Sequence, residues 1–91
     1  MAYNTEMVLG VVKVRLNRLP SDKTLDDYLR RRIEGAAEEL EGIGIHLREE
    51  SAADFMLLVD LTVWQYQNRD SGESMPKWLR AGRRERWLRK K

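Results

Sequence analysis

The chain has 91 residues and a mass of 10.7 kDa, a size that favours one compact domain, leaves little room for a deep catalytic cleft and makes assembly with further copies an expected source of stability. It has no cysteine, which excludes a disulfide framework and a thiolate nucleophile and favours an intracellular protein. The 17 basic and 15 acidic residues give a formal net charge of +2. We expect neither a signal peptide nor a membrane span, because the longest apolar stretch, residues 55–64, is too short and contains Asp60.

The first segment, residues 4–16, is open to two interpretations. Its valines favour a strand by propensity, whereas the spacing of its leucines and valines fits a helix. We predict a helix capped by Asn4 or Thr5, because the only possible partner strand, residues 43–47, is short.

An amphipathic helix is predicted for residues 24–41. Its apolar residues recur at spacings of three and four, and they are Leu25, Tyr28, Leu29, Ile33, Ala36, Ala37 and Leu40. Thr24, followed three residues later by Asp27, can cap the first turn. Gly42 can adopt the left-handed conformation that ends such a helix.

Residues 51–70 form the most apolar segment of the chain. Ser51 and Asp54 provide a start signal like that of the preceding helix, and apolar residues then occupy every face. Such a helix should be surrounded by other helices or subunits, so we place it at the centre of the fold. Turn-forming residues at positions 70–72 are expected to end it.

Pro76 predicts the start of a fourth helix, since proline is tolerated at the first helical position. We therefore predict an all-α protein, a small bundle of about four helices with a central apolar helix. A helical body, residues 1–76, would carry a basic C-terminal helix or arm, residues 77–91, in the same domain. The arm has eight basic residues and one acidic residue, whereas the body has nine basic and fourteen acidic residues. This asymmetry indicates an anionic partner for the arm.

The basic arm is compatible with a solvated helix end, a contact to nucleic acid or a docking element for an acidic protein. Trp78 and Trp87, each followed by leucine, are nine residues apart and so half a turn out of phase on a straight helix. Tryptophan beside arginine is typical of protein interfaces, so we favour protein docking over DNA binding, although one assembly could use both. Partner or oligomer contacts are assigned to Trp78, Leu79, Arg80, Arg83, Arg84, Arg86, Trp87 and Leu88. Contacts to DNA or to an acidic surface are assigned to Lys77, Arg89, Lys90 and Lys91.

No constellation in the sequence predicts catalysis, a cofactor or a metal site. His46 is the only histidine and has no Asp, Ser or Cys arrangement that would make it a base or a ligand. Three pairs of adjacent acids diverge by about 100° on a helix, so we interpret them as solvated surface. These pairs are Asp26 and Asp27, Glu38 and Glu39, and Glu49 and Glu50.

Asp60 lies in the middle of the most apolar segment. An acid there must be paired, exposed at a seam or protonated. We favour a structural ion pair or hydrogen bond with a basic residue of another helix, because no second catalytic group can be named beside it.

Four stretches of the chain resemble the small head–tail connector proteins of tailed bacteriophages and prophages. The main one is LVDLTVWQYQNRD at residues 58–70, followed by MPKWLR at residues 75–80, where an apolar helix ends in an aromatic, Asn-Arg-Asp signature and a Met-Pro turn starts the last helix. VKVRLN at residues 12–17 and LDDYL at residues 25–29 are similar to the first two helices of that family. After Arg80 the chain departs from the family pattern. The resemblance gives a structural role to Asp60, Trp64, Arg69, Asp70 and Pro76.

The resemblance implies a non-enzymatic, all-helical virion protein, assembled in the bacterial host cytoplasm and located in the neck. It would form a homo-oligomeric ring beneath the portal, extend the DNA channel and dock the next neck or tail protein. About twelve copies would match a portal by the same resemblance, although the sequence does not fix that number. The alternative is a small nonspecific nucleic-acid-binding module that uses the basic arm. A small enzyme has no mechanism that the residues support.

Overall fold

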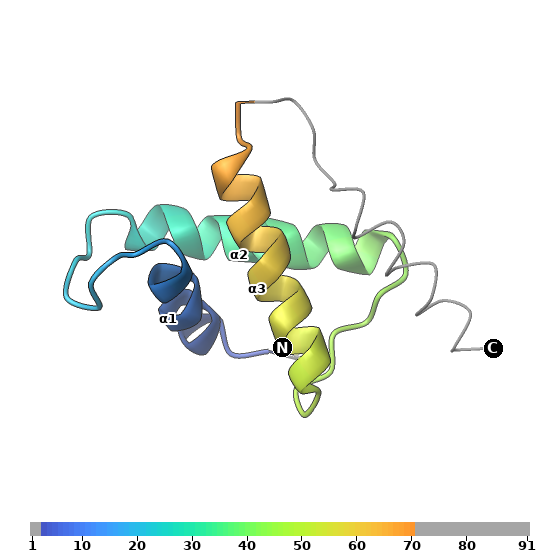
Figure 1. Ribbon diagram of the computed structural model, residues 1–91. Helices are drawn as coiled ribbons and strands as arrows, with labels where there is room; N and C mark the ends of the chain where they lie inside the picture. Colours follow the sequence, from blue (N-terminus) through green and yellow to red (C-terminus); the bar gives the residue numbers. More distant parts are fainter. Residues whose placement is uncertain (1–2, 71–91) are drawn as a thin grey trace.

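The computed structural model describes residues 3–70, which form a compact arrangement of three helices (Figure 1). They are α1 (Thr5–Arg15), α2 (Asp26–Gly42) and α3 (Ala52–Gln67), and each helix packs against the other two. This part of the chain contains no strand, so the all-α prediction is confirmed for it. The fourth helix and the boundary predicted at Pro76 lie outside the described residues. None of the three helices is both long and apolar enough to cross a bilayer.

Helix α1 begins with a side-chain cap. The Oδ1 atom of Asn4 accepts hydrogen bonds from the backbone N–H groups of Glu6 and Met7, at 3.0 and 3.2 Å. These bonds satisfy two of the backbone N–H groups that have no partner within the first turn of a helix. The helix ends at Leu16, and Asn17 then adopts a left-handed conformation with φ of 59°. The choice of helix over strand is therefore confirmed, with Asn4 as the cap.

Helix α2 begins later than the sequence predicts. Its N-cap position is Leu25, and no side chain caps the first turn. The predicted Thr24 cap is therefore wrong. The backbone N–H of Thr24 instead donates to Asp22 Oδ1 at 3.0 Å, in a turn within the preceding loop. The helix can start at Asp26 because that side chain is buried against Lys13 of α1.

The end of α2 depends on Gly44 rather than on Gly42. Gly42 is the last helical residue, whereas Gly44 has a φ of +90°, in the region that favours glycine. The N–H groups of Gly44 and Ile45 donate to the carbonyls of Glu41 and Leu40, at 3.0 and 2.9 Å. With Ile45 and Leu40 both buried, this is a Schellman ending with its hydrophobic contact.

Helix α3 starts as predicted and ends earlier. The Ser51 hydroxyl accepts a hydrogen bond from the Asp54 N–H at 3.1 Å, but the helix ends at Gln67, before the predicted turn at residues 70–72. Asn68 ends it, with its backbone N–H and its side-chain amide both donating to the Trp64 carbonyl.

The hydrophobic core of the described part is shared by all three helices and the α2–α3 loop. Its buried apolar residues are Val8, Leu9, Val12, Leu29, Ile33, Ala36, Ala37, Leu40, Ile45, Leu47, Leu58, Val59, Leu61 and Val63. Met56 of α3 is 42% exposed, and Phe55 and Leu57 are only partly buried. In residues 3–70, α3 therefore packs against both other helices but is not enclosed on all faces.

Candidate interaction surface

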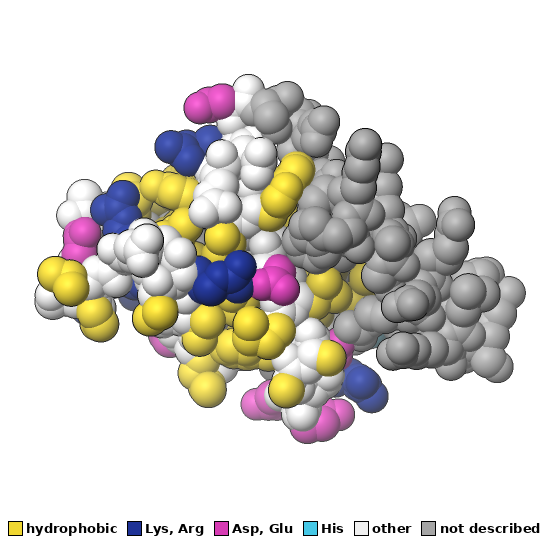
Figure 2. Space-filling view, in the orientation of Figure 1, with side chains coloured by type: hydrophobic (Ala, Val, Ile, Leu, Met, Phe, Trp, Pro, Cys, Tyr) yellow, Lys and Arg dark blue, Asp and Glu magenta, His cyan; other side chains and the backbone are white. Residues whose placement is uncertain are grey.

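Helix α1 presents apolar side chains to solvent as well as to the core. Met7 is 62% exposed and Val14 is 66% exposed, and with the exposed Gly10 and with Val11, which is partly buried against the core, they recur at a spacing of three, four and seven residues. This spacing places the four residues on one side of the helix, opposite the buried Val8 and Val12. We call Met7, Gly10, Val11 and Val14 the α1 stripe. Figure 2 shows hydrophobic side chains over α1 and the beginning of α3 on the face turned to the viewer.

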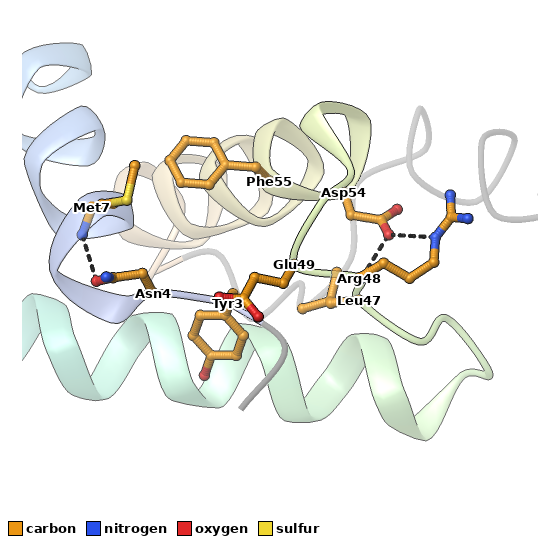
Figure 3. A pocket seen from close by; sticks show the side chains of 8 residues that line it. All are labelled: Tyr3, Asn4, Met7, Leu47, Arg48, Glu49, Asp54 and Phe55. Carbon is orange, nitrogen blue, oxygen red and sulfur yellow. Dashed lines mark hydrogen bonds and ion pairs between the residues drawn. The ribbon is translucent and has the colours of Figure 1, made fainter.

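A cavity of about 270 Å³ opens at one end of the α1 stripe. It lies between the chain before α1, the α2–α3 loop and the first turn of α3 (Figure 3). Its lining residues are Tyr3, Asn4, Met7, Leu47, Arg48, Glu49, Asp54 and Phe55. Since Met7 belongs to both the stripe and this cavity, the two form one continuous surface. We call the cavity the Met7–Phe55 pocket.

The polar groups of the pocket have distinct roles. The Asp54 carboxylate is buried and accepts a hydrogen bond from the Arg48 N–H at 2.8 Å, so it is engaged within the protein (Figure 3). Partial burial, and then the nearby charge of Glu34, raise the pKa of Tyr3 above its ordinary value of 10.0. Glu49 is exposed, and within residues 3–70 it has no ion-pair partner. Glu49 is therefore the carboxylate that the pocket offers to a partner.

Asp60 forms the interhelical ion pair that its position in the sequence favours. Arg15 of α1 donates from Nη1 to Asp60 Oδ1 at 2.6 Å, with the two side chains 42% and 39% exposed. The acid is thus paired and half exposed rather than deeply buried. A hollow of about 300 Å³ adjoins the pair and is lined by Arg15, Asp60, Val63, Trp64 and Gln67. Trp64 is partly buried there.

The end of α3 is tied to α2 by arginines and tyrosines. The Arg69 guanidinium lies over the Tyr66 ring, 4.4 Å from its centroid, and donates to the Tyr66 carbonyl. Tyr66 meets the edge of Tyr28 with ring centroids 6.1 Å apart, and Arg32 donates to the Tyr28 hydroxyl at 2.6 Å. Sequence reasoning missed this cluster, although tyrosine and arginine recur three or four residues apart on both helices. Asp70, the last described residue, is exposed.

Asp26 corrects the interpretation of the adjacent acids as solvated surface. Its side chain is 8% exposed, and its Oδ1 atom lies 2.9 Å from Lys13 Nζ. Lys13 also donates to the carbonyls of Pro20 and Asp22, at 3.0 and 2.5 Å. The phase of Lys13, four residues after the buried Leu9, was the signal that could have revealed its burial. By contrast, the Asp27 side chain is 94% exposed.

Within the described residues, His46 is not surrounded by side chains arranged for catalysis or metal binding. Its side chain is 73% exposed, and Nδ1 lies 2.8 Å from Glu41 Oε2. Residues 3–70 contain no group of three His, Asp or Glu side chains that could hold a metal ion.

The predicted residues of the arm cannot be placed, because they lie outside the described residues. They are Pro76, Lys77, Trp78, Leu79, Arg80, Arg83, Arg84, Arg86, Trp87, Leu88, Arg89, Lys90 and Lys91. Their roles stay predictions. Comparisons with models of known protein families, with curated proteins and with solved structures find no match to this chain.

Proposed function

We propose that this protein is a non-enzymatic head–tail connector that forms a homo-oligomeric ring in the neck of a tailed-phage virion. The observation that carries the proposal is the signature at residues 58–70 followed by Met75 and Pro76. In that role the ring would lie between a portal protein and the next neck or tail protein, and the DNA channel would pass through it.

The described surface supports this proposal by what it leaves exposed. Soluble monomers rarely expose contiguous apolar patches without a role, and the α1 stripe is such a patch. A short body with a small shared core also gains stability from neighbours. Both properties suit a subunit that is surrounded by copies of itself.

The test uses the full chain, alone and mixed with the portal protein of the same phage or prophage. Sedimentation velocity and negative-stain electron microscopy should show rings or ring-on-portal particles. A protein that stays monomeric when alone and does not bind the portal protein when mixed with it contradicts the connector proposal.

The second candidate is a nonspecific nucleic-acid-binding module, favoured by the eight basic residues of the arm and by the exposed Arg69. It predicts binding to free duplex DNA, with an affinity that falls steeply as salt rises. Replacing Lys90 and Lys91 by glutamine should then reduce the salt slope by about one for each phosphate that the variant no longer neutralises. The connector proposal instead predicts little affinity for free duplex at physiological salt.

A further inference from the structure

We propose that the Met7–Phe55 pocket and the α1 stripe receive residues 77–91 of a second copy of this chain, with Trp87 seated in the pocket. This inference deepens the proposed function and rests on it, since it names the contact that would repeat around the ring.

The pocket suits one aromatic side chain. At about 270 Å³ it is smaller than the roughly 300–1,000 Å³ typical of sites for small-molecule ligands. Its walls include the thioether of Met7 and the rings of Phe55 and Tyr3, which favour contact with an aromatic ring. Glu49 at the same site can accept a hydrogen bond from an indole N–H or pair with a neighbouring arginine. Trp87, flanked in sequence by Arg86, combines these features.

Charge favours the same occupant. Residues 3–70 contain nine basic and thirteen acidic residues, whereas residues 77–91 contain eight basic residues and one acidic residue. Glu49 and Glu50 are exposed beside the pocket and have no ion-pair partner among the described residues. Glu6, in contrast, is engaged by Arg30 at 2.8 and 3.0 Å. Arg48, which also lines the pocket, is engaged with Asp54 Oδ2 at 3.4 Å, so a basic segment can pair with Glu49 and Glu50 there.

The ring that the proposed function requires makes a second copy, rather than the same chain, the source of the arm. The pocket adjoins Phe55 in the first turn of α3, whereas the chain leaves α3 after Gln67 at the opposite end (Figure 1). A helix of 16 residues is about 24 Å long, and the residues at positions 68–87 can span up to about 66 Å, so both sources are within reach and the crosslinking experiment below distinguishes them. Each copy can then give its arm to the next in a head-to-tail contact, which closes into a ring when the rotation permits.

The two Trp-Leu pairs of the arm are compatible with its contact to a second copy. If residues 77–91 are helical, as the sequence predicts, Trp78 and Trp87 point to opposite sides.

Gly10 makes the stripe testable without disturbing the fold. A Cβ atom at this position would meet no other atom within 4 Å, so a longer side chain is accommodated by the free body. The same side chain would protrude from the stripe into any docked segment. Gly35 on α2 lies off the stripe and a Cβ atom there would likewise meet no other atom within 4 Å, although Gly35 is partly buried, so it provides a control whose fold is checked alongside.

The experiment compares full-length wild type, Gly10→Gln, Trp87→Ala and Gly35→Gln by sedimentation over a concentration series, with circular dichroism to check the fold. Gly10→Gln and Trp87→Ala should each weaken self-association by at least about tenfold, as expected for an interface anchor, while Gly35→Gln should match wild type. Rings that persist unchanged in both stripe and arm variants overturn the acceptor site and leave the connector function standing. A wild-type protein that neither self-associates nor binds a portal overturns both.

The absence of native cysteine permits a direct test of the donor and acceptor. Two differently tagged copies, one with Glu49→Cys and one with Arg86→Cys, are mixed and oxidised. A disulfide-linked heterodimer supports the proposal. No heterodimer, together with an intramolecular disulfide in a chain that carries both substitutions, would show that the arm packs on its own body and would refute the exchange between copies. If duplex DNA added before oxidation prevents the crosslink and excess wild-type protein does not, the arm is assigned to nucleic acid instead.

Discussion

The Nζ atom of Lys13 lies 2.9 Å from the Oδ1 atom of Asp26, and both side chains are more than nine-tenths buried. Lys13 belongs to α1, and Asp26 is the first residue of α2. The ammonium group also donates to two carbonyls of the intervening loop, those of Pro20 and Asp22. One side chain therefore fixes the start of α2 and the path of the loop that leads to it.

We expect Lys13→Met to destabilise the protein by about 3–5 kcal/mol, because it leaves the Asp26 carboxylate buried without its cation. Chemical denaturation followed by circular dichroism measures the change in the free energy of unfolding. The double variant with Asp26→Leu should recover part of the loss, since no uncompensated charge remains.

The control for this prediction is the half-exposed pair of Arg15 and Asp60, which joins α1 to α3 at 2.6 Å. Arg15→Met should cost about 1 kcal/mol or less, because solvent screens an exposed pair. Equal effects of Lys13→Met and Arg15→Met would show that burial does not determine how much the pair of Lys13 and Asp26 contributes to the free energy of unfolding.

The second prediction compares Ser51, which caps α3, with Thr24, which the sequence predicted to cap α2. Ser51→Ala should lower the free energy of unfolding by about 1 kcal/mol, because the Asp54 N–H loses its acceptor. Thr24→Ala should change it by about 0.5 kcal/mol or less, since Thr24 does not cap α2 and its side-chain hydrogen bond to Asp22 lies in an exposed turn. Thermal and urea unfolding of the two variants, measured side by side, provide the comparison. A larger effect at Thr24 than at Ser51 would contradict this ranking of the two side chains.

Two glycines should respond to alanine with opposite signs. Gly44→Ala should destabilise by about 1 kcal/mol or more, because alanine is strained at a φ of +90°. Gly10→Ala should stabilise an unassociated body by about 0.5–1 kcal/mol, since glycine is unfavourable inside α1 and the added methyl group meets no neighbour. Unfolding is best measured at a concentration where the wild type is monomeric. Stabilisation by Gly44→Ala would exclude the left-handed ending of α2.

Local patterns predicted the helices well where a side chain acts within one turn. The apolar spacing located α2 and the long apolar run located α3, whose Ser51 cap was found because serine and the N–H it binds are three residues apart. Patterns were less informative at helix ends, where Gly42 and Gly44 are equally plausible in sequence. The buried contact between Ile45 and Leu40 decides in favour of Gly44, and that contact requires the tertiary fold.

The candidate site was mostly beyond sequence reasoning for a physical reason. The pocket joins Tyr3 and Met7 to Leu47 and Phe55, residues separated by some forty positions that meet only after the helices pack. Asp26 was misinterpreted because an acid in the first turn of a helix is usually exposed, and its burial depends on a lysine in another helix. Asp60 was interpreted correctly because a charge in an apolar helix needs a partner.

Acid should weaken the fold through two carboxylates whose pKa values are lowered in the folded protein. Hydrogen bonds from Arg30 lower the pKa of Glu6 from its ordinary value of 4.5, and hydrogen bonds from Thr24 lower that of Asp22 from 3.8. Below these ordinary values the unfolded chain binds more protons than the folded one, so stability is present above about pH 4.5 and is lost as the pH falls through the lowered pKa values. Urea denaturation between neutral pH and strong acid should therefore show a declining midpoint below that pH. Glu6→Gln should remove part of this decline, whereas Glu38→Gln, at an exposed glutamate of α2 without an ion-pair partner in residues 3–70, should leave the curve unchanged. A Glu6→Gln curve that superimposes on wild type would mean that the bonds from Arg30 do not stabilise the fold.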